Sequence, residues 1–345
     1  MGKITTYALL GLWAAACLFP LYWVAVTSLK GEFQIVRGPF YVPFVDFAPS
    51  LDAWRFVLWD STDNLRLQFF NSVIVGMSST ILTVAFGAFA IYGLTRFQLN
   101  LNWLFVAIVF LSAPLAVAAV LFPSTILGLS FALAAALLLL LRKRLLQRQL
   151  NLSKNVILFF LLATRILPPV VVVLPVYLMA QRTGLLDTRL ALILTYTASN
   201  LPIAIWLLRP VFGDLVTEQE EAALVDGASR FRIFFMILVP MIAGGIAATG
   251  VLVFILCWNE YLFAAYLAAG HAMTLPPWVV GQLSMKEAQI GGDIVEWSRL
   301  SAAIVLTFVP VLACIVVAYR FLGHLSIWRN DRVPRHAISG NRSRR

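Results

Sequence analysis

Long apolar runs separated by short polar segments make up most of this chain. Because about 20 apolar residues are needed for a helix to cross the hydrocarbon core of a bilayer, the pattern predicts eight spanning helices. We place them at residues 5–28, 69–94, 102–122, 124–141, 155–180, 189–209, 241–268 and 299–323. The chain is therefore expected to form an all-α, polytopic membrane bundle as a single domain over residues 1–330. The basic tail at 331–345 is expected to be disordered.

Residues 102–141 need a reversal within one apolar run. As a single helix, these 40 residues would extend about 60 Å, twice the thickness of the hydrocarbon core. Pro123 marks the expected reversal, because proline lacks the amide proton that continues a helix and disfavours helix at the residue before it. Two full spans and a pair of helices in the membrane plane remain as alternatives. Either arrangement places the loops that follow residue 141 on the same side of the membrane.

Composition and charge fix the expected class and orientation. The chain is 61% hydrophobic and only 12% charged, which is typical of a membrane protein. Its net charge of +10 does not indicate a nucleic-acid partner, because the basic residues lie between and after the spans, where lipid contact and orientation account for them. With both termini in the cytoplasm, 17 Lys and Arg residues lie on the cytoplasmic side and 8 outside, as the positive-inside rule requires.

The polar segment at about 210–243 carries residue types at fixed spacings. In order, these are Glu221-Ala222-Ala223, Gly227 after three residues, Ile237 after nine more, and Val239-Pro240 after one more. The pattern resembles the EAA loop of importer-type ATP-binding-cassette (ABC) transporter permeases, which usually has Leu at the place of Val239. The alternative is an ordinary amphipathic loop, since apolar residues at helical spacing are common.

The same segment contains local signals for a helix, a sharp turn and a second helix. Thr217 and Glu220 have the spacing of a capping box, which predicts that the first helix begins at Thr217. Gly227 can adopt the left-handed conformation that ends a helix. Ser229 can then cap a second helix that leads toward the membrane.

The resemblance implies that the first short helix docks into a cleft of a cytoplasmic ATP-binding subunit, where Glu221 pairs with a basic residue. Small side chains at Ala222 and Ala223 keep this helix thin enough for a groove. The residues that the resemblance assigns to docking are Glu221, Ala222, Ala223, Asp226, Gly227, Phe231, Ile237 and Pro240.

Further motifs are similar to the maltose-type branch of these permeases, which imports carbohydrates. They are Ile166-Leu167-Pro168-Pro169, Leu174-Pro175-Val176-Tyr177, Gly184-Leu185-Leu186-Asp187-Thr188, Trp258-Asn259-Glu260-Tyr261 and Thr274-Leu275-Pro276. That branch normally has six spans in this subunit. The stretch 99–149 is therefore interpreted as an inserted hydrophobic hairpin, expected to pack at the periphery of the bundle.

Several residues inside the predicted spans are candidates for the solute path. Pro168, Pro169 and Pro175 interrupt one span, which predicts either a flexing point or a fixed kink used for packing. Ionisable or amide side chains inside a span are costly unless they are paired or face water. This set consists of Arg165, Asn259 and Glu260. Asn259 and Glu260 either form interhelical hydrogen bonds, line the solute path or touch an external binding protein.

Motifs for catalysis and for ATP binding are missing from the sequence. There is no GxxxxGK[ST] loop, no HExxH, no GxSxG and no metal-spaced His/Cys set. We therefore expect no enzyme activity, no metal and no cofactor on this chain, with ATP and Mg²⁺ bound by the partner ATPase.

The sequence as a whole favours a permease subunit of an ATP-driven importer of a sugar or polyol in a bacterial inner membrane. Its expected partners are a second homologous permease, two ATP-binding subunits, an extracytoplasmic binding protein and membrane lipid, without nucleic acid. An ion-coupled secondary transporter is the alternative, although such proteins typically place several carboxylates near the membrane midplane and often show internal repeats.

Overall fold

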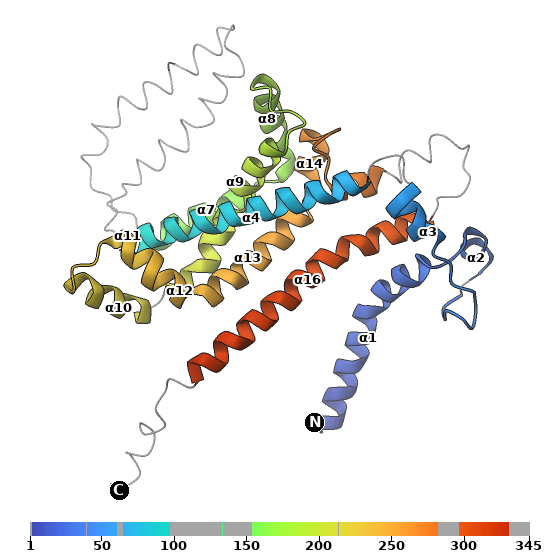
Figure 1. Cartoon of the computed structure of the whole chain (residues 1–345), viewed down its shortest axis with the longest axis horizontal. Coiled ribbons are helices and arrows are strands. Elements are labelled where there is room, and N and C mark those ends of the chain that lie inside the picture. The colour runs from blue at the N-terminus through green and yellow to red at the C-terminus, as the bar shows by residue number, and fades with distance from the viewer. Residues whose placement is uncertain are drawn as a thin grey trace. The chain divides into compact units, whose positions relative to one another are not determined.

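The computed structural model describes residues 2–38, 40–60, 65–96, 133, 154–212, 214–281 and 297–330 (Figure 1). Every regular element within these ranges is a helix, and a single isolated β-bridge joins Pro43 and Phe47. The all-α prediction is therefore confirmed. The predicted spans at 102–122 and 124–141, most of the insertion at 99–149 and the tail at 331–345 lie outside the described residues.

Four of the described helices are long and apolar enough to cross a membrane. They are α1 (Lys3–Thr27), α4 (Leu65–Arg96), α9 (Arg189–Leu208) and α16 (Trp297–Asn330). In α16 the spanning window ends at Val317, and in α9 it extends to Val211 through the 3-10 turn η3 (Arg209–Val211). These helices confirm the predictions at 5–28, 69–94, 189–209 and 299–323.

The predicted interruption of the span at 155–180 is confirmed at Pro168 and Pro169, where the chain leaves the helix instead of kinking within it. Helix α7 (Lys154–Ala163) and the 3-10 turn η2 (Thr164–Ile166) are followed by α8 (Pro169–Arg182) at an angle of 84°. Leu167 and Pro168 have extended backbones, with ψ of 127° and 129°. A residue before proline avoids the helical region, and Pro169 suits the first turn of a new helix. Two consecutive prolines therefore divide the apolar run.

The predicted helix at 241–268 is also divided. Helix α13 (Ala243–Trp258) ends before Asn259, and a short α14 (Leu262–Leu267) follows. At its other end, α13 is bent by 77° from the helical segment that precedes it. Counting each bent pair as one span gives up to six spans among the described residues, so the total of eight stays a prediction.

The chain forms two compact units. The first contains Met1–Ile74 and Ala268–Ala313, including α2 (Glu32–Arg37), α3 (Asp52–Arg55) and the π-helical turn η1 (Phe56–Asp60). Segments far apart in sequence are joined here by buried polar groups. The Asn71 amide donates to the carbonyls of His271 and Met273 at 2.7 and 2.9 Å, and the Ser72 hydroxyl accepts from the amide of Leu275.

The second unit contains Val75–Leu267 and Cys314–Arg345. Its helices approach closely where side chains are small. A Cβ atom at Gly87 would lie only 3.2 Å from that of Ala204 in α9, and one at Gly76 would lie 3.2 Å from the ring of Phe254 in α13. Small residues of this kind let the backbones of membrane helices approach and gain van der Waals contact. They account for the close packing of α4 against α9 and α13.

Among the glycines that the structure describes, the closest approach is at Gly245 in α13, where an added methyl group would overlap both γ-methyl groups of Val211. Valine cannot move these methyl groups aside cheaply, because its side chain is restricted to few rotamers. We predict that Gly245→Ala destabilises the protein by about 1–3 kcal/mol, measured by thermal unfolding in detergent. Gly250→Ala in the same helix is the control, since no atom beyond its chain neighbours and the nearby backbone of its own helix lies within 4 Å of its Cβ position. Equal stability of the two variants would contradict the prediction.

Candidate coupling site

The polar loop folds as a helix, a turn and a second helix, as the local signals predict. Helix α10 (Asp214–Val225) is followed by α11 (Arg230–Ile233), the π-helical turn η4 (Phe234–Leu238) and α12 (Val239–Met241). Figure 1 shows these elements together at one end of the second unit, in yellow and light orange.

The turn between α10 and α11 depends on Gly227. Its φ is +80°, a conformation that costs other residues energy because of their Cβ atom. The amide of Gly227 donates to the carbonyl of Leu224 and that of Ala228 to Ala223, both at 3.0 Å. This pair of bonds is the Schellman motif. The hydroxyl of Ser229 then accepts from the amide of Arg232 and caps α11, as predicted.

The predicted capping box at Thr217 is wrong. Helix α10 begins three residues earlier, at Asp214, so Thr217 lies inside the helix rather than at its start. Glu220, the other member of the predicted box, is instead buried, with 2% of its surface exposed. Its carboxylate binds charged and polar side chains on other elements. These bind an anion more strongly than the single backbone amide of the predicted capping box would.

Three side chains bind the Glu220 carboxylate. The Nε of Arg96, the last residue of α4, donates to one oxygen at 2.5 Å, and the Tyr92 hydroxyl donates to the other at 2.9 Å. Arg230, from the start of α11, lies 3.5 Å from the same oxygen as Tyr92. Charge-assisted bonds from a guanidinium are about twice as strong as neutral ones. They fix α10 and α11 to the end of a spanning helix.

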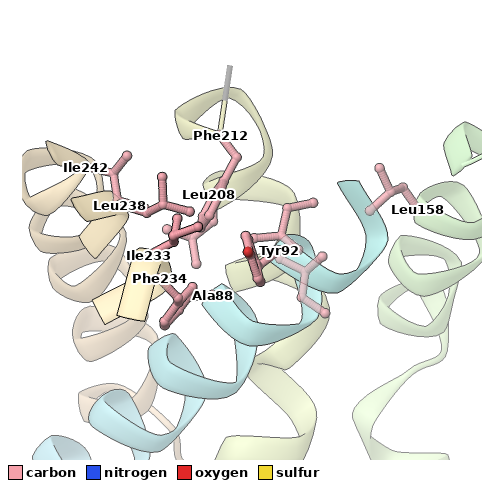
Figure 2. Close-up of a cluster of buried hydrophobic side chains, with 11 residues drawn as sticks. Ala88, Tyr92, Leu158, Leu208, Phe212, Ile233, Phe234, Leu238 and Ile242 are labelled. Atoms are coloured by element: carbon pink, nitrogen blue, oxygen red, sulfur yellow. The ribbon is translucent and has the colours of Figure 1, made fainter. Parts of the chain in front are cut away.

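An apolar cluster lies beside this ion pair. Figure 2 shows Ala88 and Tyr92 from α4 facing side chains from η4 and from the end of α9. The rings of Phe89 and Phe234 stack with centroids 4.7 Å apart. Besides Ala88 and Tyr92, the buried members are Ile91, Leu158, Ile205, Leu208, Phe212, Ile233, Phe234, Leu238 and Ile242. The second half of the loop is therefore part of the core that holds α4, α7 and α9 together.

The opposite side of the loop is exposed. We call the surface formed by Glu221, Ala222, Leu224, Val225, Asp226 and Phe231 the docking face. Its apolar side chains are far from buried: Val225 is 87% exposed and Phe231 75%. Gly227 and Pro240 are also exposed. Of the remaining residues assigned to docking, Ala223 and Ile237 pack against the apolar cluster instead, which limits their contact with a partner.

Arg165 and Glu260 have separate partners. Arg165 lies in the break between α7 and α8, where its guanidinium donates to the Asn200 side chain of α9 at 2.9 Å. Asn200 is buried and in turn donates to the Tyr196 carbonyl and to Cys257 Sγ. The Glu260 carboxylate accepts from the amide of Phe263, in the first turn of α14.

Of the remaining candidates, Asn259, Pro168 and Pro169 lie near helix breaks. Asn259 is exposed at the end of α13 and donates to the carbonyl of Ile255 at 2.9 Å. Pro168 and Pro169 are exposed at the 84° bend, whereas Pro175 is half-buried inside α8. Within the described ranges, no three His, Cys, Asp or Glu side chains converge on a metal-sized site. The expectation of no metal stays a prediction.

Comparison with known proteins decides the family. The sequence profile described as "Binding-protein-dependent transport system inner membrane component" matches residues 127–326. The chain belongs to this family. It is a membrane-embedded permease of the ABC importer class, which works with a solute-binding protein and an ATPase, and the alternative of an ion-coupled secondary transporter is excluded.

Individual relatives agree with this assignment over most of the permease. The diacetylchitobiose uptake system permease NgcG of Streptomyces coelicolor is 30% identical over 91% of this chain and 84% of its own length. The trehalose/maltose transport system permease MalG of Thermococcus litoralis is 25% identical, with 90% of each chain covered. A chain of a bacterial ABC transporter that imports alginate has the same fold, with a TM-score of 0.61, 18% identity, and 92% of this chain and 95% of that chain covered.

Sequence reasoning did not find the two internal partnerships of this permease, Glu220 with Arg96 and Tyr92, and Arg165 with Asn200. The sequence did contain one signal for the partnership of Glu220. Glu220 and Glu221 are neighbours, and adjacent helical residues point about 100° apart, so only one of them can face a groove on a partner. The other was therefore free to face this chain. Nothing local identified Arg96, 124 residues away, as its partner.

We predict that Glu220→Gln lowers the stability of the protein by about 3 kcal/mol, because it leaves the mostly buried Arg96 guanidinium without its counter-charge. Thermal unfolding in detergent is the measurement. Glu221→Gln, the same change at the neighbouring exposed position, should cost less than about 0.5 kcal/mol. Adding Arg96→Gln to Glu220→Gln should restore part of the loss. Additive losses in the double variant would show that the two side chains do not act as a pair.

A second test concerns the contact between Arg165 and Asn200. Arg165→Met and Asn200→Leu each leave a polar group without its partner, at a cost of about 1–3 kcal/mol. The double variant should be less destabilised than the sum of the two by about 1 kcal/mol. Apparent melting temperatures of the four proteins give this coupling, and a coupling of zero would contradict the contact.

Proposed function

We propose that this permease forms the translocation pathway for a sugar or polyol together with a second, homologous permease. Two cytoplasmic ATP-binding subunits would dock on the loop at about 210–243, and an extracytoplasmic binding protein would deliver the solute. ATP and Mg²⁺ would bind to the ATPase, in line with the missing phosphate-binding motif in this chain. Both termini would lie in the cytoplasm of a bacterial cell, as the distribution of Lys and Arg favours.

The observation that carries this proposal is the two-sided construction of the loop. One side is buried against α4, α7 and α9 and contains the Glu220 ion pair. The other side, the docking face, exposes Glu221 beside a thin, alanine-containing helix. A force applied to the docking face would be transmitted to the spanning helices through packed side chains, because a packed core resists deformation. Closure of two ATPase subunits could thus move α4 and α9 as rigid elements.

The proposed solute class is supported by the relatives. NgcG is named for the uptake of diacetylchitobiose, and MalG is named for the transport of trehalose and maltose. SugB of Mycobacterium tuberculosis, which is 26% identical over 88% of this chain, is named for the transport of trehalose. All three are carbohydrates rich in hydroxyl groups. The motifs around Pro168 and Glu260 are similar to the same branch.

The docking role is tested by charge reversal at Glu221. We predict that Glu221→Lys lowers recovery of the ATP-binding subunit in an affinity pull-down from native membranes by about tenfold or more, because two basic groups would then face each other across the interface. Glu218→Lys is the matched control, since it makes the same charge change at another exposed position of α10. Its recovery should stay close to that of the unmodified protein.

The same preparations test the solute class. ATP hydrolysis by the reconstituted complex should rise with the binding protein and a sugar such as trehalose, and should lose this response in Glu221→Lys. Stimulation by amino acids but by no sugar or polyol would refute the solute class while leaving the docking role intact. Equal recovery of the ATPase with both variants would refute the docking role of Glu221.

A further inference from the structure

A pocket of about 400 Å³ lies in the first compact unit, between the end of α1 and the beginning of α16. Lys30, Thr27 and Ser301 contribute polar groups. Most of the remaining wall is apolar and consists of Trp23, Val24, Ile35, Trp297, Leu300 and Ile304. The pocket thus combines a mainly apolar wall with one cationic side chain.

Lys30 is the unusual member of this pocket. Only 4% of its surface is exposed, and its ammonium lies 4.4 Å from the ring centroid of Trp23 and 5.5 Å from that of Phe47. No hydrogen-bond acceptor for this ammonium occurs among the residues that the structure describes. Aromatic faces stabilise a cation, but an ammonium has three donors that seek acceptors. The described residues therefore neutralise this amine only in part.

Among the described residues, the acidic group that acts on Lys30 is Asp46, and one oxygen of its carboxylate is bound to backbone amides. The carboxylate of Asp46 accepts from the amides of Tyr41 and Val42, both at 2.9 Å. Burial lowers the pKa of Lys30, and the charge of Asp46 only partly opposes this shift. An anion inside the pocket would supply the missing acceptors and favour the charged amine.

The position of the pocket indicates which anion can reach it. Helix α1 ends at Thr27, and the spanning window of α16 begins at Trp297, so the pocket lies where two spanning helices meet the membrane surface. Lipid headgroups occupy this level, and tryptophan prefers it. Only 6% of the spanning window of α1 is buried in the chain, so an acyl chain can run along this helix. A stacked sugar fits less well, because the Trp23 ring already carries the Lys30 ammonium.

We propose that this pocket binds an anionic phospholipid, with the phosphate of the headgroup on the Lys30 ammonium and the upper part of an acyl chain against the apolar wall. The lipid would fill the space between α1 and α16 and complete the neutralisation of Lys30. This site is separate from the docking face and does not depend on the identity of the imported solute.

The test measures phosphatidylglycerol bound to the full transporter complex, purified in detergent and exchanged into phosphatidylcholine nanodiscs with or without phosphatidylglycerol. Native mass spectrometry counts the phosphatidylglycerol that stays bound. Lys30→Met, which keeps the length of the side chain but removes its charge, should lower this binding about fivefold. Lys3→Met makes the same change at the exposed other end of α1 and should leave it unchanged. Ser301→Leu fills the pocket without changing its charge and should also lower it.

Two other occupants give different results. If inorganic phosphate displaced phosphatidylglycerol from the unmodified complex and bound equally well, the pocket would be a site for a small anion, and the lipid proposal would be overturned. If Lys30→Met left phosphatidylglycerol binding unchanged but separated the two permeases on size-exclusion chromatography, a partner carboxylate would be the counter-ion, which would also overturn it. Loss of lipid in both Lys30→Met and Ser301→Leu, with the complex intact and Lys3→Met normal, is the expected result.

Discussion

The buried carboxylate of Glu220 is the constraint on which the coupling loop depends. A charge removed from water is tolerated only when it is paired and hydrogen-bonded, and here its partners are Arg96 and Tyr92 of α4. Helix α10 is therefore held in the orientation in which Glu220 points inward. Because neighbouring helical residues point about 100° apart, this orientation turns Glu221 outward. The internal ion pair and the exposed docking face thus have one physical cause.

Breaks in the helices determine where other polar residues find their partners. The apolar runs at 155–180 and 241–268 are each divided, and the divisions lie beside Arg165 and Glu260. Backbone that leaves the helix in a membrane protein needs partners for its free amides and carbonyls. Glu260 supplies one of them to the first turn of α14, whereas Arg165 binds the buried Asn200 side chain. Polar groups therefore gather where the helices are interrupted.

Glu220 and Lys30, a buried charge from each unit, differ in how they are neutralised. Glu220 receives donors from Arg96, Tyr92 and Arg230, so its environment is complete within the chain. Within the described ranges, Lys30 has two aromatic faces beside it and is acted on by the Asp46 carboxylate, which accepts from backbone amides. The first arrangement makes a rigid internal joint. The second leaves room for an external anion beside Lys30, which is the basis of the lipid proposal.

The sequence by itself determined the apolar helices and the local geometry of the loop. Run length is enough to identify α1, α4, α9 and α16, and the signals at Gly227 and Ser229 act over only a few residues, because capping and left-handed turns are short-range effects. Only the tertiary structure decided that Glu220 faces inward, that Ala223 and Ile237 pack in the core, and which partners bind Arg165 and Lys30. These outcomes depend on contacts between residues up to 124 positions apart, and such contacts follow from how whole helices pack rather than from the neighbours of each residue.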